Sequence, residues 1–491
     1  MFPLGYGVFL IGDATSDGGH CAYGMDGAHS RHRQFSLAGE SMSVRVMLIW
    51  TMCVVCCGCT GDDGQSAGDA LVIIPLDQAF VDSGAGDAHP DDALGLDSTM
   101  VMTDAGEDAG RRDAAALPVL AEPIVIPLNQ SSDINIQPSV AIGHDGRIAV
   151  SWCENGQDDL GIAFALLEHD GSIVAEPYAL DTDRAGVQNE PVVCALRSGG
   201  YVVVWSTDSQ RAGREGQNLS MRLRVVGAEG LPASDDEQIV DTGMPGNHWL
   251  ADVACDPAGG FIVVGSNSEE NGTFGVFAQR YTQDGRIRGT PIQMNEDPQG
   301  NQTFPSIAID ESGAALIAWE DHRGFGTPQE VYRITARRLG AEDTRPMGPE
   351  ITVVESLDEV TRPDLSLDSN SGDAVIGVIM NQRKAGLFTV EGATDAVDSW
   401  SVPEDGISYY PALTYGGNGV HLLLYLEGVR DGVTARLRRL DESGVGEDAL
   451  ILAQGNLPPY SASLDARDGR VVVAWTERGE GNTYYVRIAG L

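Results

Sequence analysis

Acidic side chains recur at one position of a repeated sequence unit, directly after its second apolar run. Carboxylates gathered at that position could collect Ca²⁺, a cationic group or a sugar, because hard cations need several oxygen ligands. The polar loops of a very acidic chain would carry such residues in any case, so a solvated-loop interpretation competes with a site. The positions are Glu154, Asp208, Glu269, Asp321, Glu427 and Glu477.

The densest polar cluster is the run Glu320-Asp321-His322-Arg323, which has the residue types for acid–base chemistry. A single cluster without a counterpart in the other loops is typical of a solvated loop, so we predict no catalytic residue. The sequence contains no sialidase-type Asp box, phosphate loop, zinc motif or calcium-loop spacing. We expect no cofactor, with Ca²⁺ as the alternative, and a ligand bound by some of Glu154, Asp208, Asp321, His322, Glu427 and Glu477.

These residues belong to a repeat in which an apolar run, a tight Gly turn and a second apolar run follow one another. Both runs alternate as half-buried strands do, and pairs such as Asp145-Gly146 suit a hairpin turn. The starts lie roughly 48 to 60 residues apart, a spacing typical of propellers. The copies begin at Pro138, Pro191, Ala251, Pro305, Pro363, Pro411 and Ser461.

Two further strand-like runs follow each hairpin, which makes four strands per unit, the content of one propeller blade. The last copy has only three runs, and residues 122–129 supply a spare strand before the first copy. We therefore predict an all-β, seven-bladed β-propeller over residues 122–491, closed by this N-terminal strand. Six or eight blades remain alternatives, because the fifth copy is degenerate.

Tryptophans close the second run in four copies: Trp152, Trp205, Trp319 and Trp475. A solvent-facing ring of indoles would stack sugars, whereas indoles that alternate with buried aliphatic residues fill the space between blades. The period-two pattern favours the core.

Three cysteines, Cys153, Cys194 and Cys255, fall within the repeats. Cys194 and Cys255 lie on first strands of neighbouring copies but one position out of register, so we expect their side chains to face opposite ways. A disulfide between Cys153 and Cys194 is possible, and three buried thiols are the equal alternative.

The chain carries 72 acidic and 31 basic residues, a formal net charge of −41. Such a surface repels nucleic acid and anionic lipid and favours cations, cationic polymers or neutral ligands. Adaptation to salt is the competing explanation of the charge.

Residues 42–59 have the pattern of a secretory signal: Arg45, an apolar stretch from Met47 to Cys57, and Gly58 before Cys59. The stretch is too short for a permanent membrane helix. Residues 1–41 have no targeting character, which indicates a doubtful leader and a true start at Met42. Residues 60–121, rich in Asp, Ala and Gly, are predicted to form a disordered acidic tether.

The signal resembles that of bacterial lipoproteins, and residues 42–491 resemble the tethered all-β propeller lipoproteins of bacterial envelopes. The resemblance implies a lipid at Cys59, and Thr60, which is not acidic, implies the outer membrane. We expect a monomeric, non-enzymatic binding or scaffolding protein that contacts the membrane only through its lipid and takes a protein or glycan ligand at the cell surface. The alternatives are a carbohydrate-active hydrolase or lyase that uses carboxylates such as Asp321 and Glu477, and an assembly partner of outer-membrane proteins.

Overall fold

The computed structural model describes residues 9–12, 30–37, 40–47, 124–125 and 135–490. The last range has gaps at 156–159, 184–185, 209–218, 241–245, 269–272, 325–328, 343–344, 382–383, 401–406, 430–431, 442–443, 456–461 and 479–483. Cys59, Glu269, the predicted tether and most of the predicted signal peptide lie outside these residues. The chain divides into two compact units, which meet in sequence between Leu117 and Pro118.

The first unit contains one antiparallel sheet of β1 (Phe9–Gly12), β2 (Ser30–Leu37) and β3 (Glu40–Met47), in the order β1-β3-β2. Strand β3 overlaps the start of the predicted signal peptide at Met42.

The second unit is built from four-stranded antiparallel groups, which we name after their first strands. The β5 sheet holds β5 (Asn135–Ile142), β6 (Ile148–Asn155), β7 (Leu160–Leu167) and β8 (Ile173–Ala179). The β9 sheet holds β9 (Gln188–Ala195), β10 (Tyr201–Thr207), β11 (Ser220–Val226) and β12 (Gln238–Ile239). The β13 sheet holds β13 (His248–Cys255), β14 (Phe261–Ser268), β15 (Phe274–Tyr281) and β16 (Ile287–Gln293).

The β17 sheet holds β17 (Asn301–Ile309), β18 (Ala315–Arg323), β19 (Val331–Leu339) and β20 (Met347–Ser356), and one parallel bridge joins it to the β13 sheet. The β21 sheet holds β21 (Val360–Leu367), β22 (Ala374–Met380), β23 (Lys384–Val390) and β24 (Val397–Trp400). The β25 sheet holds β25 (Ile407–Gly417), β26 (Val420–Val429), β27 (Gly432–Asp441) and β28 (Gly444–Gly455). The β29 sheet holds β29 (Ala462–Arg467), β30 (Arg470–Arg478), β31 (Tyr484–Gly490) and, from the other end of the unit, β4 (Ile124–Val125).

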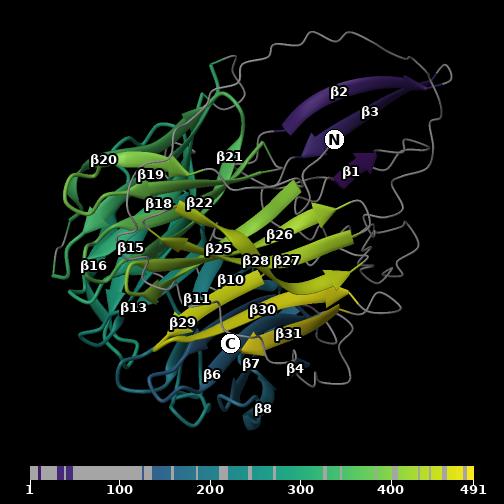
Figure 1. Cartoon of the computed structure of the whole chain (residues 1–491). Coiled ribbons are helices and arrows are strands. Elements are labelled where there is room, and N and C mark those ends of the chain that lie inside the picture. The colour runs from purple at the N-terminus through teal and green to yellow at the C-terminus, as the bar shows by residue number, and fades with distance from the viewer. Residues whose placement is uncertain are drawn as a thin grey trace, which may run out of the picture. The chain divides into compact units, whose positions relative to one another are not determined.

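The described elements are all strands, as predicted, and Figure 1 shows the groups arranged as in a propeller. No helix among these residues has the length and apolar character needed to cross a membrane. Strand β4 lies antiparallel to β31, with Ile124 opposite Ile488 and Val125 opposite Arg487.

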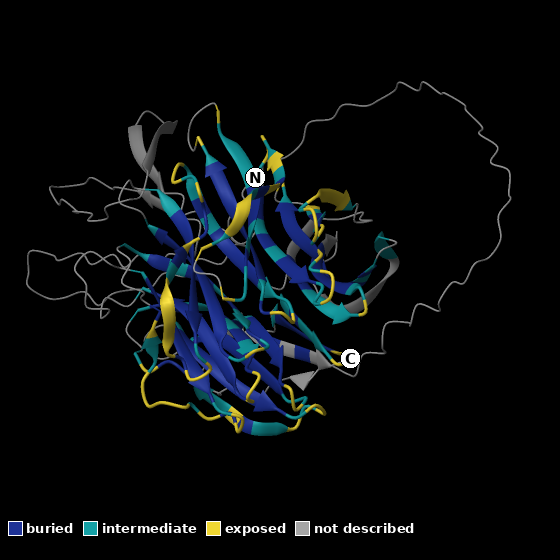
Figure 2. Ribbon diagram, turned by 90° about the vertical axis from the view of Figure 1, so that its left-hand side faces the viewer, coloured by how far each residue is buried: buried dark blue, intermediate teal, exposed yellow. Residues whose placement is uncertain are grey.

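The first strands are the inner strands of this arrangement. β5, β9, β13, β17, β21, β25 and β29 contact one another in that order, and β29 also contacts β5. We call the contact between two neighbouring sheets a seam. Apolar side chains from facing sheets fill the seams. Figure 2 shows the buried residues of these strands in dark blue.

The four tryptophans lie in this core, as predicted: Trp152, Trp205 and Trp319 are 0% exposed and Trp475 is 2% exposed. Trp205 packs against the β5 sheet and Trp319 against the β13 sheet. These two indoles therefore fill the seams with the preceding sheets, because side chains alternate between the two faces of a strand.

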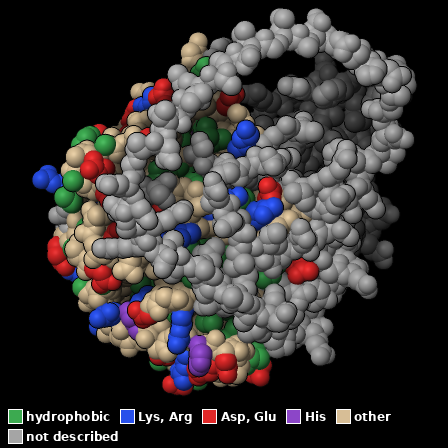
Figure 3. All heavy atoms as spheres, in the orientation of Figure 1, with side chains coloured by type: hydrophobic (Ala, Val, Ile, Leu, Met, Phe, Trp, Pro, Cys, Tyr) green, Lys and Arg blue, Asp and Glu red, His purple; other side chains and the backbone are tan. Residues whose placement is uncertain are grey.

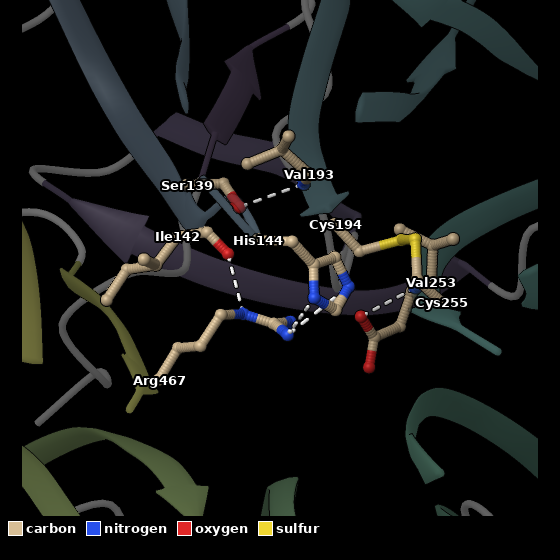
Figure 4. Close-up of a disulfide and its surroundings, with 9 residues drawn as sticks. Ser139, Ile142, His144, Val193, Cys194, Val253, Cys255 and Arg467 are labelled. Carbon is tan, nitrogen blue, oxygen red and sulfur yellow. Dashed lines mark hydrogen bonds between the residues drawn. A yellow bond between two sulfur atoms is a disulfide. The ribbon is translucent and has the colours of Figure 1, made fainter. Parts of the chain in front are cut away.

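Neither the possible Cys153–Cys194 disulfide nor the alternative of three thiols is found, since Cys194 is bonded to Cys255 with Cα atoms 5.8 Å apart (Figure 4). The two cysteines do point to opposite faces of their own sheets, but the sheets pack face to face, so opposite faces confront each other across the seam. Cys153 is a buried free thiol on the face toward the β9 sheet, whereas Cys194 faces the β13 sheet.

Candidate functional site

Among the described residues, five inner strands carry a β-bulge near their starts at a residue with positive φ. In each, the register with the second strand shifts around this residue. A bulge re-aims a side chain and is common beside functional sites. Proline follows four of the five residues, and Ala251 follows the fifth. The bulge residues are Gln137, Glu190, Leu250, Phe304 and Arg362, with φ between 51° and 58°.

Bulge residues from separate sheets interact at this end of the inner strands. The Arg362 guanidinium lies over the Phe304 ring, 4.8 Å from its centroid. Burial raises the pKa of Glu190, and the charge of Arg362 opposes that rise. Since Glu190, Phe304 and Arg362 belong to the β9, β17 and β21 sheets, the bulges bring residues distant in sequence to one place.

Glu320 completes this group, which we call the axial cluster: Glu190, Phe304, Glu320 and Arg362. Glu320 follows Trp319 on β18 and is 0% exposed. Its Oε1 accepts the backbone N–H of Arg362 at 2.6 Å. Burial raises the pKa of this carboxyl to about 8, against the lowering effects of the Arg362 N–H and charge. The cluster thus combines a guanidinium on an aromatic face with two carboxyls that hold protons more tightly than usual.

Deeper along the inner strands, two more carboxyls lie in a second cluster. Ser306 Oγ donates to Asp364 Oδ1 at 3.1 Å. Asp252 Oδ2 accepts the N–H of Ile307 at 2.9 Å, and Asp364 Oδ2 accepts that of Leu413 at 2.7 Å. Burial raises the pKa of Asp252 to about 6, and burial together with the charge of Asp252 raises that of Asp364 to about 7. These bonds cross seams, so this cluster fastens neighbouring sheets.

The predicted residues Asp321 and His322 are buried in a polar network of the fold. Asp321 is 1% exposed and accepts hydrogen bonds from Gln302 Nε2 at 3.1 Å and Arg323 Nε at 2.8 Å. Arg323 also pairs with Asp297 at 2.8 Å. The His322 ring packs edge-on against Tyr332, and burial lowers its pKa to about 4. This network joins β18 to the segment before β17.

The other predicted binding residues lie on separate sheets. Glu154 and Glu427 are 7% and 6% exposed, and Glu427 pairs with Arg436. Asp208 accepts the N–H of Val187 at 2.5 Å, and Glu477 is half-buried beside the end of β30. Within the described part of the chain, no three His, Cys, Asp or Glu side chains are grouped to hold a metal. In the face that Figure 3 shows, acidic and basic side chains of the described residues are interspersed.

Of the axial cluster, the sequence interpretation named only Glu320, in the run Glu320-Asp321-His322-Arg323, because its candidates all follow the second strand. The available signal was the residue before the proline that opens a copy: Glu190-Pro191, Phe304-Pro305 and Arg362-Pro363 place charged or aromatic side chains where the other strand positions are mostly apolar. Nothing in the sequence indicates that these residues meet.

No protein-family model and no curated protein matches the sequence. Among solved structures, an ulvan lyase of polysaccharide lyase family PL25 matches with a TM-score of 0.50 and 10% identity, covering 75% of this chain and 95% of that one. The polysaccharide lyase Uly1 matches with a TM-score of 0.50 and 11% identity, covering 72% and 89%. A protein of unknown function from Dyadobacter fermentans has 13% identity and a TM-score of 0.48, covering 76% and 98%. At these identities the likeness shows the fold alone.

Proposed function

We propose that this chain is a carbohydrate-active β-propeller whose ligand binds at the axial cluster. The observation that carries the proposal is the meeting of Glu190, Phe304, Glu320 and Arg362 from three sheets, with both carboxyl pKa values raised. Perturbed carboxyls brought together with a fixed cation are typical of sites that exchange protons. The seven groups with inner strands in a closed order of contacts, and the β4–β31 pairing, support a closed seven-bladed propeller.

Glu190 is the residue we assign to proton exchange. It is half-buried, whereas Glu320 is fully enclosed. A carboxyl with a raised pKa is suited to donate to a glycosidic oxygen, or to accept a proton from a sugar, near neutral pH. Arg362 would hold negative charge on the ligand, and its stacking on Phe304 fixes the direction of the guanidinium.

Non-enzymatic binding is the second candidate. Three carboxyls with raised pKa values accept backbone N–H groups of neighbouring sheets: Glu320, Asp252 and Asp364. These bonds favour the second candidate, because they give the carboxyls a structural role. Under this candidate the axial cluster holds a glycan without cleaving it.

The export of the protein as a lipoprotein of the outer membrane, anchored at Cys59 and extended by residues 60–121, is part of the proposal. The signal pattern supports it, and the Cys194–Cys255 disulfide agrees with an oxidising compartment. Radioactive palmitate should label the wild type and not Cys59→Ala, and equal labelling would refute the anchor.

A glycan array followed by product analysis of each bound glycan tests the function. Glu190→Gln should keep binding and lose most turnover, because the amide keeps the shape but cannot exchange the proton. Asp321→Asn, outside the axial cluster, is the matched control and should keep turnover. Binding without products in the wild type would favour the second candidate, and no binding would overturn both.

A further inference from the structure

Two seams satisfy the same backbone group with different side chains. At the seam of the β9 and β13 sheets, Ser206 Oγ accepts the N–H of the bulge residue Leu250 at 3.0 Å. At the seam of the β17 and β21 sheets, Glu320 Oε1 accepts the N–H of the bulge residue Arg362 at 2.6 Å. Ser206 and Glu320 both directly follow the tryptophan of their strands. Since a hydroxyl suffices for this bond, the larger and ionisable group at Glu320 needs another explanation.

The second carboxyl oxygen of Glu320 gives that explanation. Among the described residues, Oε2 is buried and has no partner at full hydrogen-bond geometry, although the Thr361 hydroxyl acts on this carboxyl as a donor. An ionised carboxylate with a buried, unsatisfied oxygen is costly, so the group keeps its proton at neutral pH. The groups that influence it from β21 and its approach are the Thr361 hydroxyl and Arg362, which favour ionisation, and Glu359, which opposes it.

The protonation of Glu320 changes the field at Arg362. While Glu320 is neutral, it does not offset the positive charge that Arg362 holds over Phe304. When Glu320 ionises, a negative charge fixed beside Arg362 competes with any other anion for the guanidinium. Ser206, at the equivalent position of the other seam, does not ionise, so its charge does not change with pH.

We propose that the axial cluster takes an anionic group of its carbohydrate ligand on Arg362, and that Glu320 is a proton-linked positioning residue that sets the pH range in which the anion binds. The inference rests on the proposed function, since it assumes that the axial cluster is the glycan site. By linkage, an anion bound beside Glu320 stabilises its protonated form, so binding takes up protons.

The net charge of −41 does not prevent such a contact. At physiological ionic strength, charges are screened over about 8 Å, so the surface slows the approach of an anion more than it weakens a direct contact with Arg362. Binding should therefore be measured at 0.15 M salt or above, on the order of physiological ionic strength.

Titration calorimetry with matched oligosaccharides tests the ligand class. The probes are a glucuronate-containing oligosaccharide and its carboxyl-reduced form, and a sulfated oligosaccharide and its desulfated form. At pH 7 at least one charged probe should bind about tenfold or more tightly than its uncharged partner, a factor worth about 1.4 kcal/mol. Equal binding within both pairs would overturn the inference while the proposed function stands, whereas no binding to any glycan would refute the function itself.

Variants test the role of Glu320. The affinity of the wild type for the charged probe should fall by up to about tenfold per pH unit above pH 8, with net proton uptake in buffers of different ionisation enthalpy. Glu320→Gln keeps an oxygen for the Arg362 N–H but cannot ionise, so whatever its affinity at pH 7, that affinity should not decline above pH 8. Ser206→Ala, the matched control at the other seam, should keep the decline. An unchanged decline in folded Glu320→Gln would overturn the role of Glu320.

Discussion

At the seam of the β9 and β13 sheets, a hydroxyl and a disulfide hold the inner strands, whereas at the seam of the β17 and β21 sheets a buried carboxyl does so. Both seams must supply a hydrogen-bond acceptor for the backbone, because each bulge leaves an N–H that the neighbouring sheet has to satisfy. The first seam meets this requirement with groups that stay neutral. The second meets it with a group that titrates and that lies beside an arginine. This difference distinguishes a purely structural seam from the seam that holds the candidate site.

The largest expected effect lies on the opposite faces of the β9 and β17 sheets, at the seams with their preceding sheets. Trp205→Ala and Trp319→Ala each remove an indole that is 0% exposed, so each should lower the free energy of unfolding by about 3–5 kcal/mol. Urea denaturation followed by circular dichroism measures both losses. A small loss in one variant only would show that the β5–β9 and β13–β17 seams are not packed alike.

The next effect belongs to the first seam alone. Cys194→Ser together with Cys255→Ser removes the cross-link and should cost about 2–4 kcal/mol, because the unfolded chain regains freedom. The check is the melting temperature with and without reductant. The reductant should lower that of the wild type and of Cys153→Ser, but not that of the double variant; an equal shift in the double variant would contradict the assignment.

The smallest effect per group belongs to the titrating carboxyls. Folding raises the pKa of Asp364 to about 7 and of Glu320 to about 8, above their values in the unfolded chain, so their contribution is present in acid and is lost as pH rises through these values. We expect the free energy of unfolding to fall between pH 6.5 and 8.5, by on the order of 1 kcal/mol for each carboxyl.

This pH window isolates the carboxyls. Burial lowers the pKa values of His322 and His421 to about 4. These histidines therefore affect stability below pH 6.5, where they make the free energy of unfolding rise with pH. Glu320→Gln should remove its part of the slope, whereas Ser206→Ala should leave the slope unchanged. A stability that stays constant over the window would show that these carboxyls are already ionised in the folded protein.

Local features could be predicted from the sequence, whereas the location of the candidate site could not. Hairpins, the buried tryptophans and a strand near residue 124 follow from alternation and turn residues, which act over a few positions. Asp321 and His322 were chosen for their chemistry, yet the fold uses them in a network with Arg323 and Gln302. Residue type alone does not distinguish a solvated loop from the buried end of a strand.

By itself, the sequence determined the all-β character, the four-stranded unit and the strand face that each tryptophan occupies, because these depend on a period of two along one strand. Only the tertiary structure decided that Cys194 meets Cys255 and that Glu190, Phe304, Glu320 and Arg362 share one place. The reason is physical: these contacts depend on how whole sheets face one another and on bulges that redirect single side chains, and neither leaves a periodic trace in the chain.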